Sequence, residues 1–579
     1  MATFAVWAPL AERVRLLALD SEHELHPTAG GWWRVDLPAA GAGTDYAYLL
    51  DDDDTPLPDP RSRWQPGGVH GPSRLYDDSG YEWGDARWTG RALPGCVVYE
   101  LHVGTFTQER TFDAALDRLD HLVDLRVDLV EVLPVNAFNG SHNWGYDGVG
   151  WYAVHEPYGG PDGFKRFVDG CHQRGLGVLL DVVHNHLGPS GAYQTRFGPY
   201  LKEGRSTWGQ LVNLDGPGSA EVRRYIVDNA LMWLREYHVD GLRLDAVHAF
   251  VDLGATHLLE QLAVEVDALS AHLRRPLTLI AESDLNDPRL VTARDGGGYG
   301  LTAQWDDDVH HALHAALTGE RQGYYADFGP LSVLAKALCC AFVHDGGWSS
   351  FRGRPHGRPV DRTRVPGYRF VTFLQNHDQV GNRALGDRLS TMVSTELLKV
   401  GAALLLTSPY TPMLWMGEEW GASTPWQFFT SHPQPELASQ AGASRMEEFA
   451  EHGWSTADVP DPQDPETLLR STLDWKEVDR EEHAGLLDWY RRVIALRRDR
   501  AELADPRLDR VVVTCDEADR WIVVSRGGLR VAANLAAGRQ QVPLDGTPKA
   551  VLLASAPGFV YRDGLIELDG ESVAVVELA

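Results

Sequence analysis

Carboxylate side chains follow several apolar, β-branched segments in the middle of the chain. Asp245, Glu282 and Asp378 are three of them. Strands of a parallel barrel present reactive side chains at their C-terminal ends, so these acids are expected to converge. Three converging acids can supply the nucleophile, the proton donor and the charge stabilisation of a retaining glycosidase. The pattern therefore predicts a site for glycoside hydrolysis at one end of a barrel.

Asp245 lies two residues after Arg243 at the end of the segment 241–245. Side chains alternate along a strand, so both residues are expected on the same side, facing the barrel mouth. A guanidinium next to a carboxylate stabilises the ionised form, which a nucleophile requires. The alternative is an Arg–Asp ion pair whose function is structural.

Glu282 and Asp378 could serve as the proton donor and as the group that stabilises positive charge. Glu282 follows the very apolar segment 277–281, where desolvation is expected to raise its pKa, as a general acid requires. Taken alone this evidence is weak, because carboxylates are common at strand ends. Asp378 is preceded by Asn376 and His377. As a third ionised acid it could bind sugar hydroxyls and stabilise the charge of an oxocarbenium-like transition state.

A fourth segment contains Asp181, Asn185 and His186, which could orient the sugar ring and the acids. Metal binding is the main competing use of such residues. No His-Glu-x-x-His or Cys/His finger spacing is present, and Arg243 opposes a cation near Asp245. We therefore predict no cofactor and no catalytic metal, and a peripheral Ca²⁺ stays open. A Ser–His–Asp hydrolase is disfavoured because no Gly-x-Ser-x-Gly elbow occurs at a strand–helix turn.

The composition is that of a globular protein with a strongly acidic balance. Its 579 residues include 53 Lys and Arg against 82 Asp and Glu, a net charge of −29, which argues against nucleic acid as a partner. Membrane-length apolar segments and a signal-peptide pattern are absent, so we expect a cytoplasmic protein without a membrane partner. Five cysteines without Cys-x-x-Cys spacing indicate reduced, mostly buried thiols. The oligomeric state does not follow from the sequence.

The elements expected around the acids are those of an α/β protein. Strand-like and helix-like segments alternate from Cys96 onward, which matches a (β/α)8 TIM barrel better than an open doubly wound sheet. A Gly-x-Gly-x-x-Gly turn is absent after the first strand, so a dinucleotide fold loses support. The expected strands are 97–103, 128–134, 177–183, 241–245, 277–282, 302–306, 370–376 and 411–417. The clearest expected helices are 112–124, 162–174, 219–237, 255–273, 393–407 and 483–500.

Short alternating strands flank the barrel on both sides. We predict an N-terminal β-sandwich domain at 1–90, a catalytic barrel at 91–503 and a C-terminal β-sandwich domain at 504–579. Four barrel strands are followed by long insertions, and loops of this length are usually functional. The insertions are 136–160, 187–218, 318–366 and 418–482.

In this order, the four acid-bearing segments resemble the signature regions of the α-amylase family of glycoside hydrolases, over about residues 97–500. The resemblance implies that Asp245 is the nucleophile, Glu282 the acid/base and Asp378 the transition-state stabiliser. It also implies that an aromatic ring stacks on the catalytic sugar and that basic residues surround that sugar. The N-terminal sandwich looks like the starch-binding-type module of branching and debranching members. The expected substrate contacts are Tyr146, Asp181, Asn185, His186, Arg243, His248, Asn376 and His377.

Three further segments, 100–107, 374–382 and 416–425, resemble the members of that family that act on maltooligosyltrehalose. The resemblance implies a glycosidase that cleaves the α-1,4 bond next to the terminal trehalose of this oligosaccharide. His248 stands where many amylases carry Lys, in agreement with a different sugar on the leaving-group side. The alternatives are a branching or debranching enzyme of the same family and a non-catalytic glycan-binding protein. The intact acids argue against the last.

Overall fold

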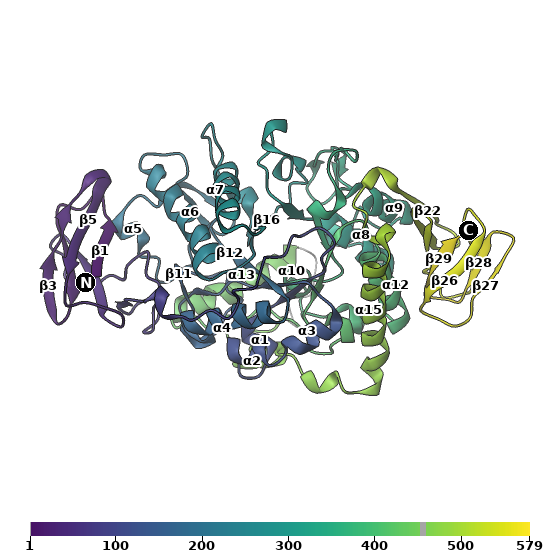
Figure 1. The fold of residues 1–579 in the computed structure, drawn as a ribbon, viewed down its shortest axis with the longest axis horizontal. Helices are drawn as coiled ribbons and strands as arrows, with labels where there is room; N and C mark the ends of the chain where they lie inside the picture. The colour runs from purple at the N-terminus through teal and green to yellow at the C-terminus, as the bar shows by residue number, and fades with distance from the viewer. Residues whose placement is uncertain (1, 452–458) are drawn as a thin grey trace.

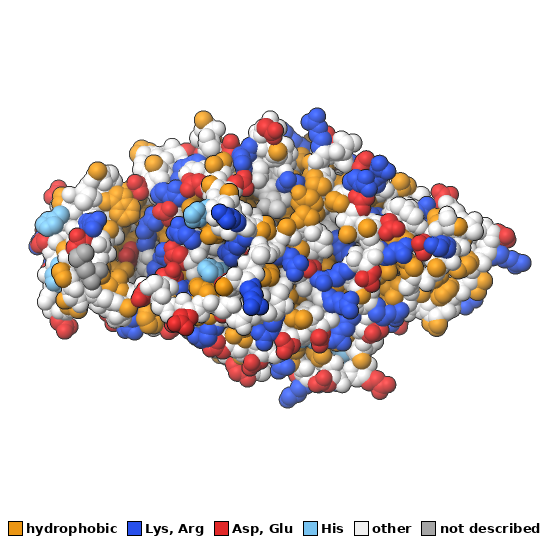
Figure 2. Space-filling view, in the orientation of Figure 1, with side chains coloured by type: hydrophobic (Ala, Val, Ile, Leu, Met, Phe, Trp, Pro, Cys, Tyr) orange, Lys and Arg blue, Asp and Glu red, His pale blue; other side chains and the backbone are white. Residues whose placement is uncertain are grey.

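The computed structural model describes residues 2–451 and 459–579. β-Sheets lie at the two ends of an elongated molecule, and a helix-rich body lies between them (Figure 1). The described residues contain no helix that is both long and apolar enough to cross a membrane. On the face shown in Figure 2, basic and acidic side chains are interspersed, so this face presents no extended charge of one sign.

Eight strands close into a barrel in the order β12-β15-β16-β17-β20-β21-β8-β9, and all neighbouring pairs are parallel. Their side chains are buried on both faces, as expected for parallel strands that helices cover. The predicted (β/α)8 barrel is confirmed. The strands are β8 (Val98–Leu101), β9 (Leu129–Val132), β12 (Gly177–Val182), β15 (Gly241–Leu244), β16 (Thr278–Ala281), β17 (Ala303–Trp305), β20 (Phe370–Phe373) and β21 (Thr411–Trp415).

The alternation of side chains along the strands determines which residues face the barrel interior. Leu179 and Ile280 pack in a small cluster inside the barrel, whereas Leu180 belongs to the large core under the helices. Alternate residues share a face, so Asp181 and Glu282 continue the inner rows at the C-terminal ends of β12 and β16.

All the expected helices form, with 112–124 divided into two, and 307–318 forms an additional helix. Among the described residues, one barrel unit has no outer α-helix. After β16 the chain forms only two 3₁₀ turns, Pro288–Leu290 and Arg294–Gly296, before β17 begins. Proline and the three consecutive glycines 296–298 are poor helix formers, which explains why no α-helix forms here. The outer helices are α2 (Phe112–Leu116), α3 (Leu119–Leu125), α4 (Gly160–Gln173), α6 (Ser219–Glu236), α7 (Leu258–Leu273), α8 (Asp307–Thr318), α12 (Thr395–Leu406) and α15 (Glu481–Asp499).

The N-terminal region forms the two sheets β1-β5-β4 and β3-β2-β6-β7. The ring of Phe4 on β1 lies 4.9 Å from that of Tyr46 on β6, so the two sheets pack against each other. The predicted domain boundaries, 1–90, 91–503 and 504–579, stay predictions. The strands are β1 (Ala2–Trp7), β2 (Val14–Ala18), β3 (Ser21–Glu24), β4 (His26–Pro27), β5 (Trp32–Leu37), β6 (Asp45–Leu50) and β7 (Ser73–Arg74).

The C-terminal region forms a five-stranded sheet, β22-β23-β24-β29-β26, and a three-stranded sheet, β25-β28-β27. Strands β23, β24 and β29 share a core with β25 and β28, so the two sheets pack on each other. The strands are β22 (Val511–Asp516), β23 (Trp521–Arg526), β24 (Leu529–Asn534), β25 (Gln540–Pro543), β26 (Pro548–Ala554), β27 (Val560–Arg562), β28 (Leu565–Leu568) and β29 (Ser572–Leu578).

The long insertions carry their own elements. The first contains the hairpin β10 (Asn136–Ala137) with β11 (Gly150–Val154), and the second contains β13 (Leu201–Ser206) with β14 (Gly209–Val212). In the third, α9 (Leu331–Cys340) packs against β22. The fourth contains α13 (Pro435–Glu451) and α14 (Pro465–Ser471), and its residues 452–458 lie outside the described part.

The cysteine side chains are less buried than expected. Cys96 and Cys171 are buried, but Cys339, Cys340 and Cys515 are only partly buried, so the prediction of mostly buried thiols is wrong. All five are free thiols. The physical reason is that Cys339 and Cys340 lie at the end of α9, and that Cys515 lies on β22, an edge strand of its sheet.

Candidate active site

A cavity of about 660 Å³ lies at the C-terminal ends of the barrel strands. The three predicted catalytic acids, Asp245, Glu282 and Asp378, line it together with Tyr146 and His186. The structure thus brings side chains from five separated parts of the chain to one place. A cavity of this size is typical of small-molecule sites.

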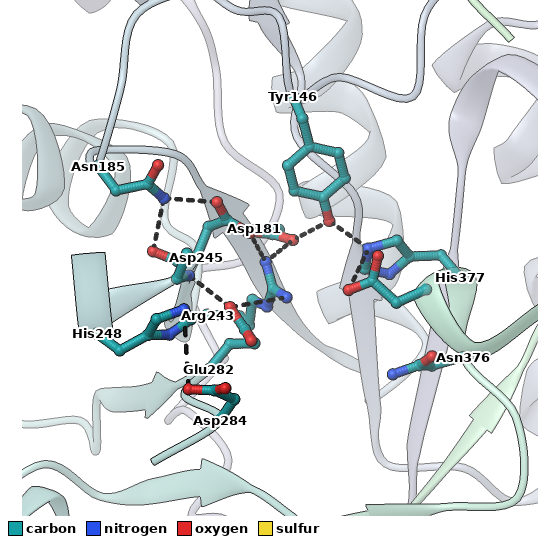
Figure 3. Close-up of polar contacts among 12 residues, drawn as sticks. Tyr146, Asp181, Asn185, Arg243, Asp245, His248, Glu282, Asp284, Asn376 and His377 are labelled. Carbon is teal, nitrogen blue, oxygen red and sulfur yellow. Dashed lines mark hydrogen bonds and ion pairs between the residues drawn. The ribbon is translucent and has the colours of Figure 1, made fainter. Parts of the chain in front are cut away.

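Asp245 is held from two sides (Figure 3). Arg243 Nη1 donates to Asp245 Oδ1 at 2.6 Å, and Asn185 Nδ2 donates to Asp245 Oδ2 at 2.6 Å. The guanidinium is fully buried, so its charge is little screened and stabilises the Asp245 carboxylate. The geometry does not decide between a nucleophile and a structural ion pair, because the pair is buried and Asp245 also lines the cavity.

Glu282 lies next to the same guanidinium. The backbone N–H of Ala246 donates to Glu282 Oε2 at 2.5 Å, and Arg243 Nη2 lies 3.8 Å from that oxygen. Ala246 has a φ of 40°, an uncommon conformation for a residue with a Cβ. Burial raises the pKa of Glu282 above its usual value, and Asp245 adds to the rise while Arg243 opposes it. A carboxyl in this environment can be protonated and act as a general acid.

Asp378 is the most accessible of the three acids, with 40% of its side chain exposed. Its Oδ2 lies 3.4 Å from His377 Nε2, and His377 Nδ1 contacts Glu100 Oε1 at 2.5 Å. Burial lowers the pKa of His377, but the carboxylates of Asp378 and Glu100 outweigh it and raise that pKa to about 9. His377 is therefore a buried cation at neutral pH that faces Asp378.

Tyr146 connects the two halves of the site. Its hydroxyl donates to Asp181 Oδ2 at 2.6 Å and lies 2.8 Å from His377 Nε2, and its ring stacks on that of His377. Arg243 Nη1 also donates to Asp181 Oδ2 at 2.8 Å. Burial raises the pKa of Asp181 to about 7, against the opposing charge of Arg243. Through these two hydrogen bonds, Asp181 holds the side chains of Tyr146 and Arg243 in place.

The remaining predicted residues divide into two groups. His186 lines the cavity, and its Nε2 lies 2.9 Å from the carbonyl oxygen of Tyr146. Asn376 is fully buried, does not line the cavity and accepts a hydrogen bond from the N–H of Gln379 as the N-cap of α10 (His377–Gly381). His248 also lies outside the cavity lining, 4.0 Å from Asp284 Oδ1.

Sequence reasoning missed several residues of the cavity wall. Asp307 follows β17 and accepts a hydrogen bond from Gln379 Nε2 at 3.3 Å. Burial, with the nearby carboxylates of Glu282 and Asp378, raises the pKa of Asp307 to about 8. The signal was present, because Asp307 follows an expected strand as the other acids do. The other missed wall residues include Trp208 and Trp305.

The sequence predicted no catalytic metal at the cluster of Asp245, Glu282 and Asp378. Within residues 2–451 and 459–579, no group of three or more His, Cys, Asp or Glu side chains is arranged to hold a metal ion. The buried positive charge next to Asp245 and Glu282 comes instead from Arg243.

Known proteins resemble the chain over its full length. The family described as alpha amylase, catalytic domain, matches residues 110–208, and a domain of unknown function matches residues 506–575. Proteins named malto-oligosyltrehalose trehalohydrolase are similar: that of Mycobacterium tuberculosis is 54% identical, with 100% of both chains covered, and that of Arthrobacter ramosus is 57% identical, with 99% of both covered. A crystal structure from Salmonella typhimurium, of a protein regarded as an alpha amylase, is 39% identical with a TM-score of 0.91 and covers 99% of this chain and 97% of its own. The chain belongs to the malto-oligosyltrehalose trehalohydrolase family, a branch of the α-amylase family of glycoside hydrolases.

Proposed function

We propose that this chain hydrolyses the α-1,4-glucosidic bond next to the terminal trehalose of maltooligosyltrehalose, releasing trehalose and a maltooligosaccharide. The observation that carries the proposal is the cavity lined by Asp245, Glu282 and Asp378, in a chain 54% identical over its full length to a malto-oligosyltrehalose trehalohydrolase. Action in the cytoplasm, and the lack of nucleic acid and membrane partners, stay predictions.

The first step forms a covalent glycosyl–enzyme intermediate. Asp245 attacks the anomeric carbon of the sugar on the non-trehalose side of the bond, and the bond to the trehalose oxygen breaks. Glu282 donates its proton to that oxygen, so trehalose leaves as a neutral sugar. The environments of the two acids support this division, because Arg243 stabilises a charged Asp245 while burial favours a protonated Glu282.

The second step restores the enzyme. Glu282, now a carboxylate, takes a proton from a water molecule, and the resulting oxygen attacks the anomeric carbon and displaces Asp245. Two displacements at one carbon retain the α configuration. Asp378 faces the cavity and can bind sugar hydroxyls and stabilise the positive charge that develops on the ring in both steps.

Aromatic side chains give the cavity flat walls that fit sugar rings. Tyr146, Trp208, Trp305 and Phe428 all line it. The ring of Tyr146 is fixed by Asp181 and His377, so it is oriented before the substrate binds. Trp208 is 45% exposed at the turn between β13 and β14, where it can cover a bound sugar.

The test is incubation with maltotriosyltrehalose, with the sugars resolved by chromatography. We expect equal amounts of trehalose and maltotriose, and no trehalose from the Glu282→Gln variant over the same time. The first maltotriose to form, followed by proton NMR, should be the α-anomer. Cleavage of α-1,6 branches without trehalose release would instead indicate a debranching enzyme, and binding without any sugar release would indicate a glycan-binding protein.

A further inference from the structure

Two adjacent cysteines end helix α9, outside the sugar cavity. The Sγ atoms of Cys339 and Cys340 lie 3.0 Å apart and share a hydrogen bond, and both side chains are partly exposed. Neither residue lines the active-site cavity. Neighbouring side chains in a helix normally point in different directions, so this approach depends on how the helix ends.

The end of α9 is fixed by a buried tyrosine. Ala341 has φ 63° and ψ −80°, a conformation that residues with a Cβ rarely adopt. The Tyr410 hydroxyl accepts from the Ala341 N–H at 2.8 Å and donates to the Ala337 carbonyl at 2.6 Å. Tyr410 is fully buried, so the fold holds the two sulfur atoms in place before any ligand binds.

The surroundings favour a thiolate. The hydrogen bond from Cys339, with the positive charges of Arg362 and Lys336, lowers the pKa of Cys340 and outweighs burial and Asp345, which raise it. Lys336 lies one helical turn before Cys340 and is itself paired with Asp345 at 2.9 Å. Soft metal and metalloid centres bind cysteine as the thiolate. The arrangement therefore makes one sulfur reactive and places a second sulfur beside it.

We propose that Cys339 and Cys340 form a dithiol site for a trivalent arsenic(III) centre, which both sulfur atoms bind at once. Two sulfur atoms 3.0 Å apart, each about 2.3 Å from one central atom, subtend roughly 80°. This is near the right-angled pyramidal geometry of trivalent arsenic. It is far from the tetrahedral angle of zinc, which also needs four ligands. The described residues offer no third His, Cys, Asp or Glu for a metal here.

A disulfide is the competing fate of the pair. It would require the sulfur atoms to close from 3.0 Å to about 2.05 Å. An arsenic atom spans the existing gap with little change in the backbone. With phenylarsine oxide, two As–S bonds form, the arsenic–oxygen double bond breaks, and the two thiol protons leave with the oxygen as water. No atom changes its oxidation state.

The experiment uses the full chain and phenylarsine oxide, followed by intact mass measurement and thiol counting. We expect one adduct per chain, the loss of two reactive thiols, and reversal by a small dithiol. Cys339→Ser and Cys340→Ser should each weaken binding at least about a hundredfold, because single-point attachment loses the gain from two linked bonds. Alanine variants at the same positions serve if a serine variant does not fold.

Cys515→Ser is the matched control, because Cys515 is also partly buried and lies on β22, which packs against α9. It should bind phenylarsine oxide as tightly as the wild type. Turnover of maltotriosyltrehalose, retained in all three variants, reports an intact fold. The proposal is overturned if the wild type takes up no arsenical, if it is isolated as a disulfide, if either single variant keeps full affinity, or if Cys515→Ser loses it.

Discussion

The two sides of the sugar cavity stabilise their carboxyl groups by different means. On one side, Asp245 and Glu282 lie beside the guanidinium of Arg243, at 2.6 Å and 3.8 Å. On the other side, Asp307 has no ion pair among the described residues, and it accepts a hydrogen bond from the side-chain amide of Gln379 at 3.3 Å. Burial and its acidic neighbours raise the pKa of Asp307 to about 8.

One cavity can hold several acids because their charges are compensated in different ways. Beside Arg243, the buried cation compensates the charge of the Asp245 carboxylate. Asp307 has no such cation, and burial favours its protonated form. Attack on the sugar requires the charged carboxylate, which Arg243 provides for at Asp245. We therefore expect the covalent chemistry to depend on the Arg243 side, and the Asp307 side to affect mainly the pH dependence of stability.

The largest expected effect is that of Asp245→Asn. Loss of the nucleophile should lower kcat by about 10⁴-fold or more, because the amide cannot form the glycosyl intermediate. The amide keeps the shape of the side chain, so the far-ultraviolet circular dichroism and the thermal midpoint should stay close to those of the wild type. A collapse of the folded signal would favour a structural ion pair over a nucleophile.

Glu282→Gln should have the next largest effect, a loss of about 10²–10⁴-fold with maltotriosyltrehalose. The reason is that glutamine cannot protonate the departing trehalose. An α-maltosyl fluoride needs no such proton, so formation of the glycosyl intermediate from it should be far less impaired, as pre-steady-state release of fluoride can measure. Equal losses with both substrates would mean that Glu282 is not the proton donor.

Arg243→Gln tests the cation directly. We expect kcat/KM to fall by about 10²-fold, because the Asp245 carboxylate loses the guanidinium that donates to it at 2.6 Å. Arg243→Lys is the matched control, since it keeps the charge while losing the guanidinium geometry. If kcat/KM falls equally in both variants, geometry rather than charge is what Arg243 provides.

The barrel and its first three acids could be predicted from the sequence because they follow local rules. Apolar runs of strand length mark β15 and β16, and alternation puts Arg243 and Asp245 on one face. The same rules place an acid after β17 but could not identify Asp307 as the one that lines the cavity. It lies within three consecutive acids after β17, and no local pattern decides which of them faces the cavity.

Tertiary contacts make that decision. Asp306 caps α8 by accepting from the N–H of Val309, and Asp308 accepts from the N–H groups of Val343 and His344. Only Asp307 is left to face the sugar cavity. Trp208 escaped prediction for a similar reason, because a long insertion carries it over the cavity and its path depends on distant contacts.

Asp307→Asn should give the smallest effect, a rise in the thermal midpoint of about 2 °C. The pKa of Asp307 rises from 3.8 to about 8 on folding, so between these pH values the folded state keeps a proton that the unfolded state has released. Stability therefore falls as the pH rises through this window, and the cost is complete above about pH 8. The asparagine variant avoids this cost, so its advantage over the wild type should be absent near pH 4 and largest at pH 8.

The neighbouring Asp308→Asn variant is the matched control with the opposite sign. Burial raises the pKa of Asp308, but its hydrogen bonds with His344 outweigh burial and lower that pKa below its usual value. Folding therefore favours the charged form, a contribution that is present at neutral pH and is lost as the pH falls through the lowered pKa. Asp308→Asn should be less stable than the wild type at pH 7, with the difference fading in acid. If both variants shifted the midpoint in the same direction, the contrast between a carboxyl stabilised by its proton and one stabilised by its partners would fail.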